Sequence, residues 1–224
     1  MLDTKSKKLQ PLDNLIEHLI KLVCYISFPL ILLFLLTIAI SLIMTGGLNT
    51  NVNSANSFLN VLLIFSLPMI VSLAIIPLVI KIVVGKNSLE QLGLDIPKKS
   101  NVIMCIVMSL TSIVLAVILS NAKGLNVSAW TVLIHFFFVA IAEEIILRSV
   151  ILNELQYITT NKWLLCVING AIFAFIYHSS EDFASNLFVR VPLGVVLCVI
   201  RIKCDSVYPA IAFHWLYNMF ISTI

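Results

Sequence analysis

Long apolar runs are the feature that most constrains the fold of this chain. Two of them cover residues 23–45 and 58–84, and each contains few or no charged side chains. A transmembrane α-helix needs about 20 consecutive apolar residues, whereas a transmembrane β-strand alternates polar and apolar side chains. The chain is 60% hydrophobic and 11% charged, while soluble domains average about 25% charged residues. We therefore predict an all-α fold, a polytopic transmembrane helical bundle.

The apolar runs predict about seven spans, within a range of six to eight. They cover residues 23–45, 58–84, 101–120, 130–157, 162–178, 184–202 and 206–224. A shorter amphipathic run, residues 12–22, precedes them, and we expect it to lie along the membrane surface. We divide the chain into an N-terminal part, residues 1–98, with this run and two spans, and a membrane core, residues 99–224.

Lysine and arginine positions orient the predicted bundle, because short cytoplasmic loops of membrane proteins are enriched in these residues. With the spans above, only Lys123 falls on one side. The other side receives Lys5, Lys7, Lys8, Lys81, Lys86, Lys98, Lys99, Lys162, Arg201 and Lys203. We therefore predict a cytoplasmic N-terminus. The net charge is only +3 and no dense basic face is evident, so membrane lipid is an expected partner and nucleic acid is not.

Two adjacent carboxylates and a guanidinium interrupt the fourth apolar run. They are Glu143, Glu144 and Arg148. One such charge near the centre of a membrane helix costs roughly 2.5–3.5 kcal/mol, so an ionisable residue at this depth indicates a functional site by default. Glu144 and Arg148 are four residues apart and share one helix face, where we expect a structural ion pair. Glu143 is rotated from that face by about 100° and stays available to accept a proton from water.

Polar side chains on two later spans are the expected partners of Glu143. His178 closes the fifth span, and His214 lies inside the seventh span with Asn218 one turn later. Imidazole and amide N–H groups can stabilise a carbonyl oxygen as it becomes an oxyanion. Simpler explanations are an interfacial histidine at position 178 and an interhelical hydrogen bond from the other two residues. Together the four residues favour hydrolysis of a carbonyl compound.

These residues resemble the motifs of the CPBP intramembrane endopeptidases, which include the CAAX prenyl endopeptidases and the bacterial Abi, bacteriocin-immunity-type proteins. Glu143-Glu144-x-x-x-Arg148 matches the EExxxR motif in full, and His214-x-x-x-Asn218 matches the HxxxN motif. Two spaced motifs of this kind on separate apolar helices are a fairly specific combination.

The middle motif of that family, FxxxH, is met only in part. Ala174 stands four residues before His178, and a phenylalanine lies on either side of it. The departure concerns the packing around the histidine more than the histidine itself. The resemblance covers roughly residues 99–222.

The resemblance implies a CAAX-protease-like hydrolase, an intramembrane endopeptidase of a bacterial cell membrane. Glu143 and His178 would hold and activate the attacking water, while His214 and Asn218 would stabilise the oxyanion. The substrate would be a membrane-associated peptide or protein, either prenylated or of the leader type. The cofactor is left open: the glutamate and both histidines could bind zinc. However, the chain has no HExxH motif and a glutamate mechanism needs no ion, so we expect no obligatory metal.

Two other functions remain open. A non-catalytic bacteriocin-immunity or scaffold protein would keep the polar cavity without turnover, and the incomplete middle motif is consistent with it. A small proton-coupled transporter would use the glutamate pair as a proton relay, although the chain has no internal repeat of the kind many transporters show.

Two further polar residues have expected roles outside the chemistry. We predict that His135 is a core or interface histidine. Arg190 could snorkel, pair with Glu181 or Asp182, or meet a substrate group, and snorkelling is the favoured role.

Straight spans leave one inconsistency, because they place Glu143 and His178 at different depths. The glutamate would lie ~21 Å and the histidine ~6 Å from the outer face. A fourth span that begins at residue 136 instead of 130 would bring the glutamate to ~10 Å from that face.

Overall fold

Helices build the fold of the computed structural model, which describes residues 12–48, 57–120 and 128–222. Within these ranges no strand occurs, so the all-α prediction is confirmed. Five helices are long and apolar enough to cross a membrane, and shorter apolar helices complete a bundle of about seven segments, as predicted. The lysines at positions 5, 7, 8 and 123, used above for orientation, lie outside the described residues.

The N-terminal part contributes two long helices, in which η marks turns with π-helical hydrogen bonding. They are α1 (Leu12–Thr45), followed by a second helix made of α2 (Phe58–Asn60), η2 (Val61–Ser66), α3 (Leu67–Met69), η3 (Ile70–Ile75), α4 (Ile76–Val79) and η4 (Ile80–Val84). The amphipathic run predicted along the membrane surface instead forms the first turns of α1, which continues without a break for 34 residues. In the second helix, π-helical turns precede and follow the segments that hold Pro68 and Pro77, since proline cannot donate an intrahelical hydrogen bond.

The core region contains the remaining elements. They are α5 (Lys99–Ser120), α6 (Ala129–Glu144), η5 (Ile145–Ile151), α7 (Leu152–Ile158), α8 (Lys162–Ile172), η6 (Phe173–Tyr177), α9 (Phe183–Ser185), η7 (Asn186–Arg190), α10 (Val191–Cys204) and α11 (Tyr208–Ile221). Elements α6, η5 and α7 form one continuous helix, Ala129–Ile158. The helix thus begins before residue 136, and a membrane boundary at that residue stays a prediction.

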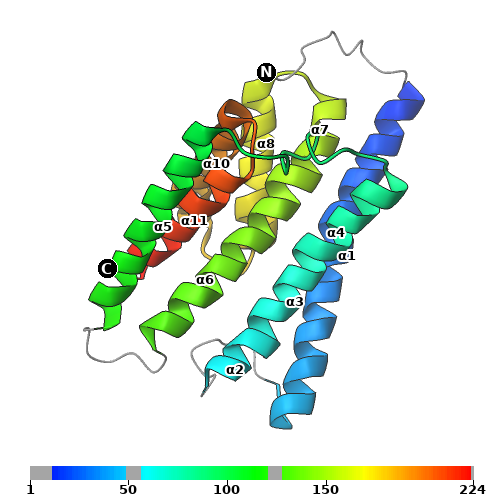
Figure 1. Ribbon diagram of the computed structural model, residues 1–224. Coiled ribbons are helices and arrows are strands. Elements are labelled where there is room, and N and C mark those ends of the chain that lie inside the picture. Colours follow the sequence, from blue (N-terminus) through cyan, green and yellow to red (C-terminus); the bar gives the residue numbers. More distant parts are fainter. Residues whose placement is uncertain (1–11, 49–56, 121–127, 223–224) are drawn as a thin grey trace.

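This continuous helix is the axis of the bundle. In Figure 1, α6 and α7 lie between α1 to α4 on one side and α5, α10 and α11 on the other. Six of the seven residues of η5 are buried, and Ile146, Leu147, Val150 and Ile151 are completely buried. The charged residues of the same stretch are therefore enclosed as well.

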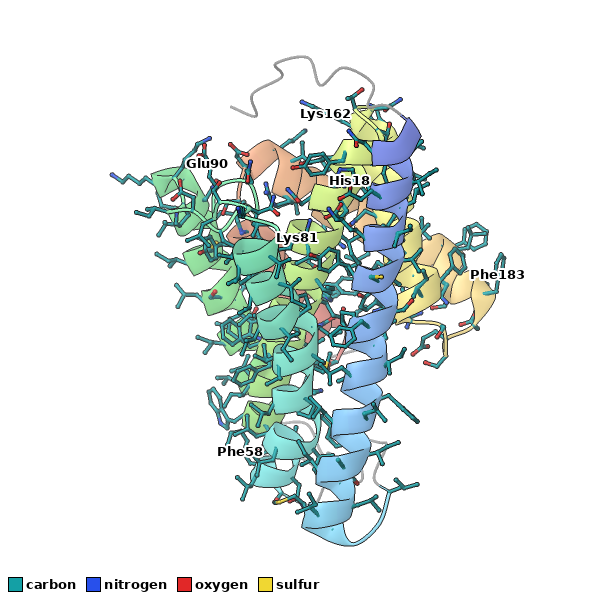
Figure 2. All side chains as sticks on the ribbon, turned by 90° about the vertical axis from the view of Figure 1, so that its right-hand side faces the viewer. His18, Phe58, Lys81, Glu90, Lys162 and Phe183 are labelled. Carbon is teal, nitrogen blue, oxygen red and sulfur yellow. The ribbon has the colours of Figure 1, made fainter. Side chains whose placement is uncertain are left out.

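The fifth and sixth segments form a hairpin that reaches only part of the way along the bundle. Its first arm, α8 with η6, is short, Lys162–Tyr177, and the chain returns through α9, η7 and α10. Figure 2 shows Phe183, just after the turn, between the level of Lys162 at one end of the bundle and that of Phe58 at the other. This explains the inconsistency in depth, because His178 lies at the turn of the hairpin instead of near the outer face.

The two arms of the hairpin approach closely at a pair of glycines. A Cβ atom added to Gly194 would lie 2.7 Å from the Cα atom of Gly170, and one added to Gly170 would lie 2.9 Å from the carbonyl oxygen of Val191. Small residues at helix contacts in membranes let the backbones meet in this way. The contact brings the backbone of α10 towards the centre of the bundle.

A buried ion pair joins the N-terminal helices to the core. Lys81, at η4, donates to the carboxylate of Glu154 and, at 2.8 Å, to the side-chain oxygen of Asn153. The second carboxylate oxygen of Glu154 lies 2.7 Å from Nδ1 of His18, whose ring stacks on Tyr157. We call Lys81, Glu154, Asn153 and His18 the Lys81–Glu154 cluster. Lys81 was counted with the loop lysines, but it is only 1% exposed.

Candidate active site

Glu144 and Arg148 lie together at the centre of the bundle. Neither side chain is exposed, and Nε of Arg148 is 3.2 Å from Oε2 of Glu144. The guanidinium also donates from Nη2 to the carbonyl oxygen of Gly194 at 3.3 Å and lies over the ring of Phe173, with its Cζ 5.5 Å from the ring centroid. Arg148 thereby links the central helix to both arms of the hairpin. The ion pair expected from the four-residue spacing is present.

Glu144 also contacts the seventh segment through His214. Oε1 of Glu144 is 2.9 Å from Nδ1 of His214, and both side chains are buried. An ionised carboxylate can only accept, so this geometry assigns the proton to Nδ1 of the imidazole. The other ring nitrogen, Nε2, is then directed at Glu143.

Glu143 lies between the two histidines. Its Oε2 atom is 3.7 Å from Nε2 of His178 and 3.8 Å from Nε2 of His214. These separations exceed direct hydrogen bonds but suit a small polar molecule between the groups. Oε2 of Glu143 and Nε2 of His178 are both buried without a hydrogen-bond partner among the described residues. We call Glu143, Glu144, Arg148, His178 and His214 the central polar cluster.

Asn218 is not part of this cluster. It lies one turn after His214 on α11 and is partly buried. No hydrogen bond joins its side chain to the described residues; only its backbone oxygen accepts, from Ser222. The sequence-predicted set is thus brought together except for this amide, which shares a helix with the cluster.

Phe173, beside the motif position held by Ala174, packs against both histidines. Its ring meets the imidazole of His178 edge to face, with centroids 4.7 Å apart, and that of His214 in the same way at 5.8 Å. It precedes His178 by five residues, and hydrogen bonds of a π-helical turn join residues five apart. Residues 173–177 form the π-helical turn η6, which directly precedes His178.

The turn that carries His178 is held by residues whose role the sequence did not indicate. Asn186 is buried and donates from its side chain to the carbonyl oxygen of His178 at 3.0 Å. Arg190 donates to the side-chain oxygen of Asn186 at 3.5 Å, and its Nη2 pairs with Oε2 of Glu181 at 3.2 Å. Arg190 therefore pairs with Glu181, which was one of its predicted roles, and the favoured role, snorkelling, stays a prediction. An asparagine four residues before an arginine in an apolar segment was the available signal.

Two other buried polar side chains hold the central helix to its neighbours. His135 lies 2.9 Å from the hydroxyl of Ser66, through Nδ1, and is a core histidine as predicted. Asn169 of α8 donates to the carbonyl oxygen of Leu147 at 2.8 Å. Asn169 was not predicted from the sequence, although an amide inside an apolar helix commonly bonds to a neighbouring helix.

The described residues contain no group of three or more His, Cys, Asp and Glu side chains placed to hold a metal ion. The zinc ligands considered from the sequence were Glu143, His178 and His214. Each would need a ligand atom about 2 Å from a common ion.

Residues 125–220 match a family model described as type II CAAX prenyl endopeptidase, Rce1-like. The family predicted from the motifs is confirmed. The Rce1-like region contains the whole central polar cluster and Asn218. No curated protein and no solved structure matches the chain significantly. The Rce1-like match and the long apolar helices indicate an integral membrane protein of the intramembrane peptidase type, with a peptide or protein as its substrate.

Proposed function

We propose that the chain is an intramembrane endopeptidase in which Glu143 activates a water molecule to hydrolyse a peptide bond. The observation that carries the proposal is the position of Oε2 of Glu143, 3.7 Å from His178 and 3.8 Å from His214. The three side chains come from three different segments and converge inside the bundle. The substrate is a membrane-associated peptide or protein, prenylated or of the leader type.

Glu143 and His178 hold the attacking water in this mechanism. The water donates one hydrogen to Oε2 of Glu143 and contacts Nε2 of His178, two buried atoms that have no partner among the described residues. As the water oxygen bonds to the scissile carbonyl carbon, its proton passes to the Glu143 carboxylate. This is general base catalysis, to which a positioned carboxylate contributes about 10²–10⁴-fold.

His214 and Asn218 stabilise the oxyanion that forms. Protonated His214 donates from Nδ1 to Glu144 and from Nε2 to the oxyanion, and the Asn218 amide supplies a second donor. In this state Glu143 is protonated, and the negative charges of Glu144 and the oxyanion are balanced by Arg148 and His214, so the buried cluster carries no net charge. Such balance lowers the penalty of enclosing ions in a low-dielectric interior.

Collapse of the tetrahedral intermediate completes the reaction. The carbon–nitrogen bond breaks, and the proton taken up by Glu143 passes to the leaving nitrogen, directly or through His178. The products are a carboxylic acid and an amine, so one water molecule has been added across the peptide bond. Every proton has a donor and an acceptor within the cluster.

Exposure of the histidines supports a substrate that is anchored in the membrane. The side chain of His178 is 28% exposed, whereas that of His214 is only 3% exposed. Access to Glu143 therefore runs past His178 at the turn of the hairpin, which lies part of the way along the bundle (Figure 2). A peptide bond reaches that depth when its chain is held at the membrane by a lipid group or an apolar segment.

The N-terminal part, residues 1–98, supports the core, residues 99–224, in this proposal. Contact between them through Lys81 and Glu154 supports that role. We further infer a bacterial cell membrane with a cytoplasmic N-terminus. The start of α1, marked by His18, and Lys162 lie at the same end of the bundle (Figure 2), and loops rich in lysine favour the cytoplasmic side.

The non-catalytic alternative, an immunity or scaffold protein, relied on the incomplete middle motif. Phe173 packs on both histidines, which removes that reason for preferring it. The transporter alternative gains no support from the described residues. Turnover by the purified protein distinguishes the enzyme from both.

The test compares the purified full chain with its Glu143→Gln variant in detergent micelles. The probes are a farnesylated CAAX peptide and an apolar leader peptide, and mass spectrometry identifies the products. We expect cleavage of one probe by the unaltered chain and a loss of about 10²–10⁴-fold in the variant. Glu90→Gln is the matched control, because it removes a carboxylate from an exposed loop residue. Equal activity in the Glu143→Gln variant would refute the assignment of Glu143 as the base.

A further inference from the structure

A cavity lies outside the central polar cluster, between the start of α8 and the end of α10. Its volume is 360 Å³, within the range of about 300–1,000 Å³ that small-molecule sites occupy. It is lined by Lys162, Trp163, Cys166, Val199, Ile202 and Lys203. The proposed reaction uses none of these residues.

The packing of the hairpin accounts for the place of this cavity. The two arms meet at Gly170 and Gly194, where no side chain separates the backbones. One turn before the first glycine comes Cys166, and beyond the second come Val199 and Ile202, whose side chains line the cavity wall. The cavity is therefore a slot between the two helices, on the side of the glycine contact where α8 begins and α10 ends.

The slot has apolar walls and a basic mouth. Lys162, at the start of α8, and Lys203, at the end of α10, are both exposed and lie on either side of it. Trp163 is exposed beside them, and tryptophan is typical of the level where membrane lipid meets water. Two cations above an apolar slot are complementary to a molecule with an anionic head and a hydrocarbon tail. A basic pocket between membrane helices is the kind of site that binds acidic lipid headgroups.

We propose that this slot binds an acidic phospholipid. The phosphate lies between Lys162 and Lys203, and one acyl chain enters the slot against Cys166, Val199 and Ile202. A phospholipid is preferred to a soluble anion because its acyl chain can lie against the apolar walls of the slot. A soluble anion would leave those walls without contact. The bound lipid would join the two arms of the hairpin at the end opposite its turn. The proposal does not depend on the proposed function.

The experiment measures lipid retention by the full chain. The protein is purified from micelles supplied with equal amounts of phosphatidylglycerol and phosphatidylcholine that carry the same acyl chains, and native mass spectrometry counts the lipids that remain bound. We expect selective retention of phosphatidylglycerol. The Lys162→Gln/Lys203→Gln variant should lose that selectivity by roughly tenfold, because each basic residue contributes to the attraction of an acidic headgroup.

A charge-matched control separates the slot from general basicity. Lys86→Gln/Lys99→Gln removes the same charge from exposed lysines that do not line the slot, and selectivity should persist. Val199→Trp fills the slot and should lower retention while both lysines remain. Selectivity that survives in the Lys162→Gln/Lys203→Gln variant, or is lost equally in the control, would overturn the proposal. Complete displacement of the lipid by inorganic phosphate would overturn the part assigned to the acyl chain.

Discussion

The central helix Ala129–Ile158 carries two buried polar clusters that differ in how completely their atoms are paired. In the Lys81–Glu154 cluster, both carboxylate oxygens of Glu154 have partners, one in Lys81 and the other in His18. In the central polar cluster, Oε2 of Glu143 has histidines on two sides at 3.7 and 3.8 Å but no hydrogen bond. The same helix thus holds one satisfied carboxylate and one that is not.

This difference indicates what each cluster is for. Buried polar groups in proteins are almost always hydrogen-bonded, so a satisfied cluster is sufficiently explained by structure. An unsatisfied group persists only when the surrounding structure holds it in place, as Glu144 and Arg148 hold the neighbourhood of Glu143. Glu143 and Glu154 are almost equally buried, at 6% and 4% exposed. They differ in whether their carboxylate oxygens have partners.

The largest expected effect is at Glu143, where a substitution should abolish most of the activity without lowering stability. Glu143→Gln should lower cleavage by about 10²–10⁴-fold and leave the apparent melting temperature in micelles unchanged or higher, because a buried charge is removed from a site without a hydrogen bond. Activity assays and thermal unfolding of the same preparation check this. A large fall in melting temperature would mean that Glu143 stabilises the fold, as Glu154 does.

The opposite result is expected at Lys81, where a substitution should lower stability but leave kcat nearly unchanged. Lys81→Met leaves Glu154 as a buried carboxylate without its cation, which should cost about 3–5 kcal/mol of stability. Thermal unfolding measures the loss, and kcat of the protein that remains folded should stay close to that of the unaltered chain. The Lys81→Met/Glu154→Gln variant should recover part of the loss, since it removes both charges. A variant as stable as the parent would show that the ion pair does not hold the N-terminal helices.

A smaller effect is expected where the two arms of the hairpin touch. Gly194→Ala adds a methyl group 2.7 Å from Gly170, and overpacking of this kind costs about 1–3 kcal/mol. It should also reduce activity, because the carbonyl oxygen of Gly194 accepts from Arg148. Gly47→Ala is a suitable control, since nothing lies within 4 Å of the added atom. Equal melting temperatures for the two variants would contradict the close packing.

Asn186 should affect activity by a moderate factor. Asn186→Ala removes the donor to the carbonyl oxygen of His178, and loss of one buried hydrogen bond costs about 1–3 kcal/mol. We expect kcat to fall by about tenfold with little change in KM, as expected if His178 is displaced while substrate binding is kept. Asn186→Asp keeps an acceptor but not the donor, and should not rescue the rate. A change confined to KM would instead assign Asn186 to substrate binding.

The smallest effect is expected from metal removal. A membrane-permeant zinc chelator should leave the cleavage rate unchanged, because every proposed step has its donor and acceptor among the chain's own side chains. Elemental analysis of the assayed sample gives the metal content. Loss of activity that added zinc restores would reassign Glu143, His178 and His214 as metal ligands.

Sequence alone predicted the class of fold and most of the central polar cluster. Apolar run length determines where a chain can cross a membrane, and a four-residue spacing determines which side chains share a helix face. Pairing between distant segments is not encoded in either pattern. Lys81 was therefore counted as a loop lysine, and Glu181 was only one of several partners considered for Arg190. The contacts of Phe173 with both histidines were not predicted either, because one of them joins two different segments.

The short hairpin made by α8 and α10 determines the depth in the bilayer at which the proposed reaction would take place. Its turn sets the reacting groups at a fixed level within the bundle (Figure 2), while a substrate helix adjusts to the local hydrocarbon thickness by tilting or shifting. Under the proposed function, the peptide bond that reaches Glu143 is selected by its depth in the bilayer as much as by recognition of the neighbouring side chains. Longer or shorter acyl chains in the host membrane would then move the cleavage position along the same peptide.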